Sequence, residues 1–241
     1  MANLVIEIGN TAVKAAWIEG VTLGRIFRYQ GEKVIEYILS LMEKEKPEVI
    51  TIASSFAVPE NDRKAIREKC RCLIVMDGTD NEILQRNGLP EYLSYDRAAS
   101  IIAARHMFKG KSCTIFDFGT TLSVDFMDAS GLYKGGIISP GCRTRFKSLN
   151  RYAKSLPLVD TPEFIPSEGN SIESSIEAGV ISGIMFETEG YIGRYPGNIV
   201  IFTGGDAIYF AKRMKNSIFV VSNLVLMGLA LITDNYVAKI N

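Results

Sequence analysis

Two short stretches of this chain combine a carboxylate with a glycine turn, a pairing that can hold a cation and phosphate oxygens. In the first stretch, Glu7 lies in an apolar run and is followed by Gly-Asn-Thr at residues 9–11. In the second, Asp117 lies in a similar run and is followed by Gly-Thr-Thr at residues 119–121. Carboxylates are good ligands for Mg²⁺, and the amides and hydroxyls of such turns bind phosphates. Each carboxylate could instead simply cap its turn, but the recurrence of the pattern favours the cation or phosphate role.

The similarity between the two stretches extends further along the chain. Each copy continues into an alternating strand, at residues 12–19 and 122–128, and then reaches a turn glycine, Gly20 or Gly131. A repeat with so long a period predicts two similar domains. We place them at 1–110 and 111–241, and we expect the two carboxylate turns to face each other across a cleft that suits a nucleotide with its metal.

Hydrophobic spacing predicts the elements that must position these turns. Apolar periodicity indicates helices at 34–45, 59–70, 96–107, 143–155, 172–191, 206–214 and 224–236, and strands at 49–53, 73–76, 198–203 and 218–221. Residues 77–95 read as a loop with a short helix at 81–86. Three adjacent strands followed by helix, strand and helix, occurring twice, predict an α/β fold of duplicated ribonuclease H-like domains, with mixed sheets flanked by helices.

Two further segments carry polar groups at helix starts. At residues 94–97 (Ser-Tyr-Asp-Arg), Asp96 can act as a helix cap or as a general base toward a substrate hydroxyl, with Arg97 binding a substrate carboxylate. On these residues alone the cap is favoured. Gly204 and Gly205 follow a buried strand. They could let the backbone approach a flat ligand closely, or they could form a plain strand-to-helix turn, and the sequence favours neither alternative.

The overall composition excludes several classes of protein. The 27 basic and 27 acidic residues balance, which argues against nucleic acid or anionic membrane as a partner. Four cysteines in a chain of 241 residues indicate reduced thiols and a cytoplasmic protein, and no apolar run is long enough to cross a membrane. The single histidine, His106, excludes a multi-histidine metal site. The chain has neither a Walker A lysine motif nor a G-x-S-x-G motif.

Five segments, taken in order, resemble the motifs of type III pantothenate kinases. They are Glu7-Ile-Gly-Asn-Thr11, Ser94-Tyr-Asp-Arg97, Asp117-Phe-Gly-Thr120, the Gly-Gly-Ile-Ile-Ser-Pro-Gly turn at 135–141, and Thr203-Gly-Gly205. The match covers essentially the whole chain. It implies an actin-like ATPase fold, a homodimer, and ATP-dependent phosphorylation of pantothenate to 4′-phosphopantothenate, the first step of coenzyme A biosynthesis. It also implies Mg²⁺ and a monovalent cation, K⁺ or NH₄⁺.

The resemblance also assigns roles to individual residues. Asp96 would be the catalytic base, Asp117 would bind the monovalent cation, and Glu7 would serve as the other metal ligand. Contacts to ATP are expected from Glu7, Ile8, Gly9, Asn10, Thr11, Ala12, Val13, Lys14, Thr120, Gly204 and Gly205. Contacts to pantothenate are expected from Asn87, Ser94, Tyr95, Asp96, Arg97 and Ser171.

Three positions depart from the family pattern. Glu7 stands where Asp is usual, Ser94 replaces a glycine, and Asn87 takes the place of a substrate-facing tyrosine, although Tyr92 is near. Two alternatives follow: a non-catalytic regulatory relative of the Bvg accessory factor type, or a kinase of the same fold with another small hydroxylated substrate. Because Asp96, Arg97 and Asp117 are all retained, we favour an active pantothenate kinase.

Overall fold

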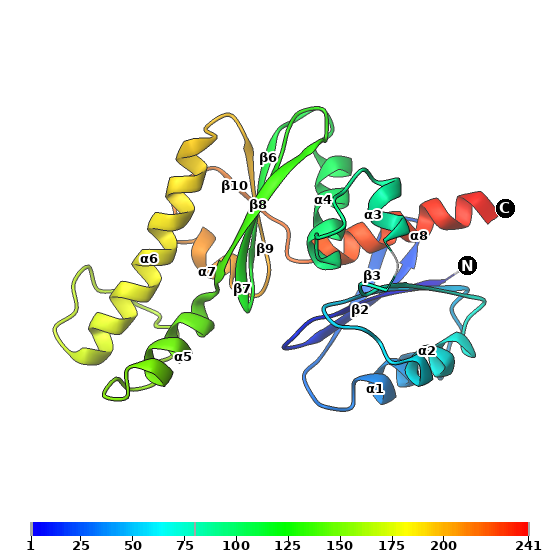
Figure 1. Cartoon of the computed structure of the whole chain (residues 1–241), viewed down its shortest axis with the longest axis horizontal. Coiled ribbons are helices and arrows are strands. Elements are labelled where there is room, and N and C mark those ends of the chain that lie inside the picture. Colours follow the sequence, from blue (N-terminus) through cyan, green and yellow to red (C-terminus); the bar gives the residue numbers. More distant parts are fainter. Residues whose placement is uncertain (1, 80, 241) are drawn as a thin grey trace. The chain divides into compact units, whose positions relative to one another are not determined.

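The computed structural model describes residues 2–79 and 81–240, with side chains up to residue 238. The chain divides into two compact units, each described by itself below. Unit 1 is formed by Met1–Met107 together with Asn223–Asn241, and unit 2 by Phe108–Ser222. Figure 1 shows that the last helix, drawn in red, lies beside the green helix α4 of the first unit.

Unit 1 is built on a mixed sheet of five strands among its described residues, in the order β3-β2-β1-β4-β5. β1 pairs antiparallel with β2 and parallel with β4. The strands are β1 (Asn3–Ile8), β2 (Val13–Glu19), β3 (Thr22–Tyr29), β4 (Val49–Ser54) and β5 (Cys72–Met76). The helices are α1 (Val34–Leu41), α2 (Glu60–Arg67), α3 (Glu82–Arg86), α4 (Tyr95–Met107) and α8 (Leu224–Ile240).

Helices cover both faces of this sheet, so its central strands are apolar on both sides. Leu4, Ile6 and Ile8 of β1 pack in one core with Ile38 of α1 and Ile66 of α2. Successive side chains of a strand point to opposite faces, so Val5 and Glu7 face the other way. On that other face, α8 packs against β1, β4 and α4. This alternation of side chains therefore places Glu7 on the face of the sheet where α8 and α4 pack.

A glycine permits the close contact between α4 and α8. A Cβ atom built on Gly228 of α8 would lie 1.9 Å from the carbonyl oxygen of Ala99 in α4. Ala98, Ala99 and Ala103 keep the facing surface of α4 small, and all three are buried. The two helix backbones approach each other closely here because neither carries a large side chain at the crossing.

Unit 2 repeats the sheet of unit 1, with the strand order β10-β9-β6-β7-β8 in its described residues. β6 pairs antiparallel with β7 and parallel with β9, as β1 does with β2 and β4. The strands are β6 (Cys113–Phe118), β7 (Thr121–Met127), β8 (Tyr133–Pro140), β9 (Ile199–Thr203) and β10 (Ile218–Val220). The helices are α5 (Cys142–Tyr152), α6 (Ile172–Arg194) and α7 (Ala207–Ala211).

An aromatic cluster fills the core of unit 2. Phe116 and Phe118 of β6 contact Phe202 of β9, and Phe118 also stacks on Phe210 of α7. The α5 and α6 helices add Phe146, Ile181 and Ile184 to the same core. This packing fixes the end of β6 against the turn that follows β9, which brings Asp117 close to Gly204.

The predicted duplicated α/β fold is confirmed, and the expected helices and strands are present with ends shifted by a few residues. Residue 80, inside the predicted loop at 77–95, lies outside the described residues. The observed division falls close to the expected boundary near residue 110. It differs in one respect, because residues 223–241 group with unit 1 and not with unit 2. Among the described residues, no helix is both long enough and apolar enough to cross a membrane.

Candidate active site

The first predicted phosphate turn joins β1 to β2 in unit 1. The Gly9 amide donates to the Ala12 carbonyl over 3.0 Å, which closes a tight turn whose tip, Asn10 and Thr11, is exposed. The Ser55 amide, just beyond β4, donates to the carbonyl of Ile8 over 3.0 Å and anchors the base of the turn. The exposed polar tip leaves this turn accessible to a ligand.

Glu7 and Lys14 form an ion pair across the base of this turn. They are opposite one another in the β1–β2 register, and Lys14 Nζ lies 3.4 Å from Glu7 Oε2. That oxygen is buried and accepts no hydrogen bond from the part of the chain that the structure describes. Burial raises the pKa of the Glu7 carboxyl, the Lys14 charge opposes this rise, and the negative charge of Asp96 adds to it. Glu7 and Asp96 therefore lie close enough within unit 1 for their charges to act on each other.

Asp96 and Arg97 occupy the first turn of α4. The carboxylate of Asp96 is partly buried and accepts a hydrogen bond from the Arg97 amide over 2.8 Å. Arg97 is 8% exposed, and Ser94, whose carbonyl accepts the Ala98 amide over 2.9 Å, is exposed. A negative side chain in the first helical turn is favourable because the helix dipole is positive there. The Asp96 carboxylate therefore lies at the positive end of the α4 dipole, where it is partly exposed.

Tyr95, which stands between the exposed Ser94 and the partly buried Asp96, has its side chain turned into unit 1. It is 7% exposed, and its hydroxyl donates to Asn81 Oδ1 over 2.8 Å. A substrate contact through this hydroxyl would compete with the bond to Asn81.

The second predicted turn lies in unit 2, between β6 and β7. The Gly119 amide donates to the Thr121 carbonyl over 3.0 Å, and Thr120 is exposed at the tip. Asp117 pairs in register with Thr203 of β9. A Cβ atom on Gly204 would lie 2.4 Å from Asp117 Oδ1, and the φ angle of Gly204 is +92°. Only a glycine fits this position, and it lets the backbone after β9 approach the Asp117 carboxylate.

The helix after this glycine pair is held to the same turn. The Asp206 amide donates to the Phe118 carbonyl over 3.1 Å, and Gly205 is exposed beside it. Burial raises the pKa of the Asp206 carboxyl. The structure thus brings together Asp117, Thr120, Gly204 and Gly205 in unit 2, just as it brings together Glu7, Lys14, Asp96 and Arg97 in unit 1.

Asn87 and Ser171 make hydrogen bonds within their own units. Asn87 follows α3, its Nδ2 atom donates to the Ile83 carbonyl over 2.8 Å, and its own carbonyl accepts Arg105 over 2.6 Å. Ser171 is the N-cap of α6, where its hydroxyl accepts the Ser174 amide over 3.1 Å. It is exposed at the edge of a pocket of about 1200 Å³ between α5 and α6.

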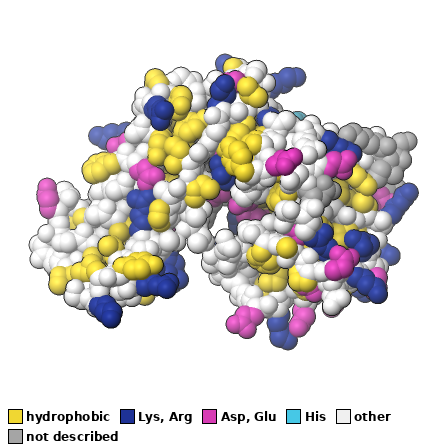
Figure 2. Space-filling view, in the orientation of Figure 1, with side chains coloured by type: hydrophobic (Ala, Val, Ile, Leu, Met, Phe, Trp, Pro, Cys, Tyr) yellow, Lys and Arg dark blue, Asp and Glu magenta, His cyan; other side chains and the backbone are white. Residues whose placement is uncertain are grey.

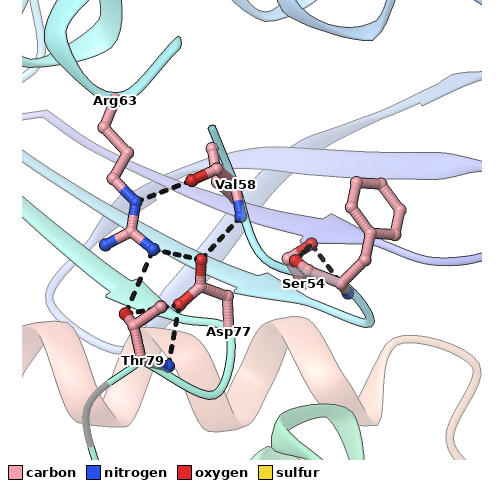
Figure 3. Close-up of polar contacts among 6 residues, drawn as sticks. Ser54, Val58, Arg63, Asp77 and Thr79 are labelled. Carbon is pink, nitrogen blue, oxygen red and sulfur yellow. Dashed lines mark hydrogen bonds and ion pairs between the residues drawn. The ribbon is translucent and has the colours of Figure 1, made fainter. Parts of the chain in front are cut away.

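Sequence reasoning missed a buried carboxylate at the end of β5. Asp77 accepts the Val58 amide over 2.7 Å, the Thr79 hydroxyl over 2.9 Å, and the Arg63 guanidinium (Figure 3). Burial alone would raise the pKa of Asp77, but these hydrogen bonds and the Arg63 charge together lower it. The sequence signal was Asp-Gly-Thr at 77–79 after a strand, a turn similar to those at Glu7 and Asp117.

A sequence profile described as type III pantothenate kinase matches residues 3–194, which include both turns, Asp96 and Arg97. The chain belongs to the type III pantothenate kinase family. A type III pantothenate kinase of Phocaeicola vulgatus is 35% identical over 232 residues, which cover 94% of this chain and 96% of the relative. One from Bacteroides fragilis is 33% identical over 232 residues, covering 94% of this chain and 95% of the relative.

Solved structures similar to this chain support the actin-like fold. A Baf family protein of Campylobacter jejuni, described as a transcriptional activator, has a TM-score of 0.62 at 19% identity, covering 97% of this chain and 98% of that one. ADP-bound MreB5 of Spiroplasma citri has a TM-score of 0.51 at 14% identity, covering 99% of this chain and 98% of that one. At these identities the likeness establishes the fold alone.

Membership of the pantothenate kinase family establishes the activity. The chain is an ATP-dependent transferase for pantothenate in the first step of coenzyme A biosynthesis. The family assignment and the predicted class of enzyme are therefore confirmed. The roles of the individual residues are the subject of the proposal below.

The residues present fit the cations that the family implies. Hard cations such as Mg²⁺ prefer oxygen ligands, and the buried Glu7 Oε2 atom has Lys14 as its charged neighbour but no hydrogen bond from the described residues. The Asp117 carboxylate, beside the open glycine turn, offers a second oxygen donor. No group of three or more His, Cys, Asp or Glu side chains placed to hold a metal occurs in the described part of the chain. Any ion would therefore depend on water and substrate oxygens as well.

Proposed function

We propose that Asp96 is the general base with which this pantothenate kinase activates the primary hydroxyl of pantothenate for attack on the γ-phosphate of ATP. The observation that carries the proposal is the place of Asp96: a partly buried carboxylate in the first turn of α4, next to Arg97, close enough to Glu7 for the two charges to act on each other. Phosphoryl transfer requires alignment and charge neutralisation more than covalent chemistry. A base that orients the hydroxyl meets the first of these needs.

The other residues of the two turns would divide the remaining tasks. Arg97 pairs with the substrate carboxylate, for which a guanidinium offers two parallel hydrogen bonds. The turn at 9–11, with Lys14, and the turn at 119–121, with Gly204 and Gly205, bind ATP. Glu7 would hold Mg²⁺ directly or through water, and Asp117 would hold the monovalent cation. These ions neutralise charge on the phosphates when they are bound. The expected cleft between the domains stays a prediction.

A coupled assay of ADP release tests the activity and its cation requirement together. With pantothenate, ATP, Mg²⁺ and K⁺ we expect turnover, and a fall of about tenfold or more when Na⁺ replaces K⁺, since a cation of the wrong size neutralises the phosphates poorly. The Asp117→Asn variant should be slow in both salts and should lose the difference between them.

Asp160→Asn, an exposed carboxylate in the same unit, serves as the matched control and should behave as the wild type. Absence of wild-type turnover with every cation tried would refute the proposed function. Turnover that is equal in K⁺ and Na⁺ would leave the kinase intact but would refute the role given to Asp117.

We also propose that the chain is a homodimer joined through the α5–α6 face of unit 2. The pocket on this face is lined by apolar residues such as Leu149, Leu156 and Ile176. Two lining residues are largely exposed, Tyr152 at 80% and Ile172 at 56%, and Phe186, further along α6, is 70% exposed. Figure 2 shows hydrophobic side chains gathered over the region of α5 and α6. Exposed apolar patches of this kind mark association surfaces, and a second copy would cover them.

Phe186→Glu should convert the dimer to a monomer, because a buried, unpaired carboxylate opposes association. Light scattering coupled to gel filtration should show a mass near two 26.6-kDa chains for the wild type and near one for the variant. Val21→Glu, a change of an exposed apolar residue in the β2–β3 turn of unit 1, should remain dimeric. A monomeric wild type, or a Phe186→Glu protein with the mass of a dimer, would contradict this surface.

A further inference from the structure

The first turn of α4 begins at a tyrosine that the family resemblance assigns to pantothenate contact, but its side chain is turned into unit 1. Tyr95 immediately precedes Asp96, its ring is buried, and its hydroxyl donates to Asn81 Oδ1 over 2.8 Å. We infer that Tyr95 is a positioning residue, which through Asn81 holds the turn carrying the base Asp96. This inference rests on the proposed function. It assigns to Tyr95 the task of connecting the base to the loop before α4.

Asp96 depends on the backbone of this turn for its orientation. Its Oδ1 atom accepts the amide hydrogen of Arg97, one residue further on, over 2.8 Å. That contact is local, so it ties the carboxylate to the helix start without fixing the helix start to the rest of the unit. The bond from Tyr95 to Asn81 supplies such a connection, because Asn81 lies 14 residues earlier in the chain, just before α3.

The segment that contains Asn81 is itself anchored at several points. At its beginning, Asp77 is held by Arg63, Val58 and Thr79 (Figure 3). At its other end, the Asn87 carbonyl accepts Arg105 Nη1 over 2.6 Å, and Arg105 lies in the last turns of α4. The α3 segment therefore holds α4 near both ends, with Tyr95–Asn81 at the end that carries the base.

The geometry distinguishes positioning from direct substrate binding. The Asn81 side chain makes no capping hydrogen bond to α3. Replacing Asn81 therefore removes its hydrogen bond with the Tyr95 hydroxyl and leaves the capping of α3 unchanged. If Tyr95 acts through Asn81, loss of either group misplaces the base and lowers kcat. If Tyr95 touches pantothenate directly, its loss raises KM for pantothenate, and the loss of Asn81 has no matching effect. A base shifted by a fraction of an ångström to 1 Å can cost one to two orders of magnitude in rate.

The experiment is a double-mutant cycle of Tyr95→Phe and Asn81→Ala in the full-length chain, read by steady-state kinetics. We expect each single variant to lower kcat about tenfold, with KM for ATP within twofold of the wild type. The double variant should be no more than about twofold slower than either single variant, because both remove the same bond. Asn81→Asp keeps the acceptor oxygen and should restore most of the rate.

A second measurement does not depend on catalysis. Hydrogen exchange of the amides in residues 95–100 should be about tenfold faster in Tyr95→Phe, since the first turn of α4 is then less firmly held. Tyr37→Phe in α1, whose ring stacks on Tyr29, is the matched control and should change neither exchange nor kinetics.

Three outcomes would overturn the inference: wild-type kcat in Tyr95→Phe, strictly multiplicative effects in the double variant, or a rise confined to KM for pantothenate. Failure of the proposed function is separable, because it appears as absent turnover in the wild type. In that case the exchange of residues 95–100 still decides whether Tyr95 and Asn81 fix this turn.

Discussion

The Asp96→Asn variant is expected to phosphorylate pantothenate about a thousandfold more slowly than the wild type. General-base catalysis contributes about 10² to 10⁴ in rate, and an asparagine amide cannot accept the hydroxyl proton. The replacement keeps the shape of the side chain and an oxygen for the Arg97 amide. The first turn of α4 should therefore persist, and KM for both substrates should stay within about threefold. The measurement is kcat and KM from the coupled assay of ADP release.

A control for Asp96→Asn is available in the same unit. Asp234 of α8 is exposed, so Asp234→Asn makes the same chemical change away from α4's first turn and should retain full activity. Should Asp96→Asn keep more than about a tenth of the wild-type kcat, Asp96 would be a binding residue and not the base. Should it lose its affinity for pantothenate with kcat unchanged, the same conclusion would follow.

Gly228→Ala should strongly destabilise unit 1. The new Cβ atom would lie 1.9 Å from the Ala99 carbonyl oxygen, and the obstruction is backbone that cannot rotate away. Forcing α8 and α4 apart should cost about 3 kcal/mol, which corresponds to a fall in Tm of roughly 5–10 °C for a chain of this size. Because α4 carries Asp96, the variant should also lose activity at temperatures where it remains folded. Thermal unfolding followed by circular dichroism measures the first effect.

Gly190→Ala is the matched control for this substitution. Gly190 also lies within a helix, α6, but a Cβ atom there would meet nothing within 4 Å. Alanine in an open helical position is more favourable than glycine by about 0.5–1 kcal/mol, so this variant should melt at or slightly above the wild-type temperature. Equal Tm values for Gly228→Ala and the wild type would contradict this prediction. They would show that α4 and α8 can move apart to admit the methyl group without loss of stability.

Local sequence patterns were sufficient to predict the elements and the repeat. The runs before Glu7 and Asp117 are strands, and the glycine turns after them join antiparallel pairs in both units. These features depend on residues close together in the chain, where apolar spacing and turn chemistry decide the conformation. The five motifs occur in the order found in the family, and this order predicted the activity. The comparisons confirm that prediction.

Contacts between distant residues could not be predicted in the same way. The pattern of 224–236 indicates a buried helix, but nothing in it specifies that α8 packs against β1 and α4 of unit 1. Likewise, Tyr95 stands inside a motif that suggests substrate contact, while its hydroxyl bonds to Asn81. The Asp77 network also requires Arg63 and Val58, from separate elements, to converge on one carboxylate. Each case depends on tertiary packing, which local spacing does not encode.

The return of α8 to unit 1 determines the order in which the two units can be completed during synthesis. Unit 2 is one uninterrupted segment, Phe108–Ser222, whereas unit 1 needs residues from both sides of it. A nascent chain that has emerged only as far as residue 222 contains every strand of both sheets but lacks the helix that covers β1 and β4. At that stage unit 2 can fold, while β1 and β4 of the first sheet still lack the packing that α8 supplies. The kinase half that carries Asp96 is therefore the last to form, although its strands are the first to be made.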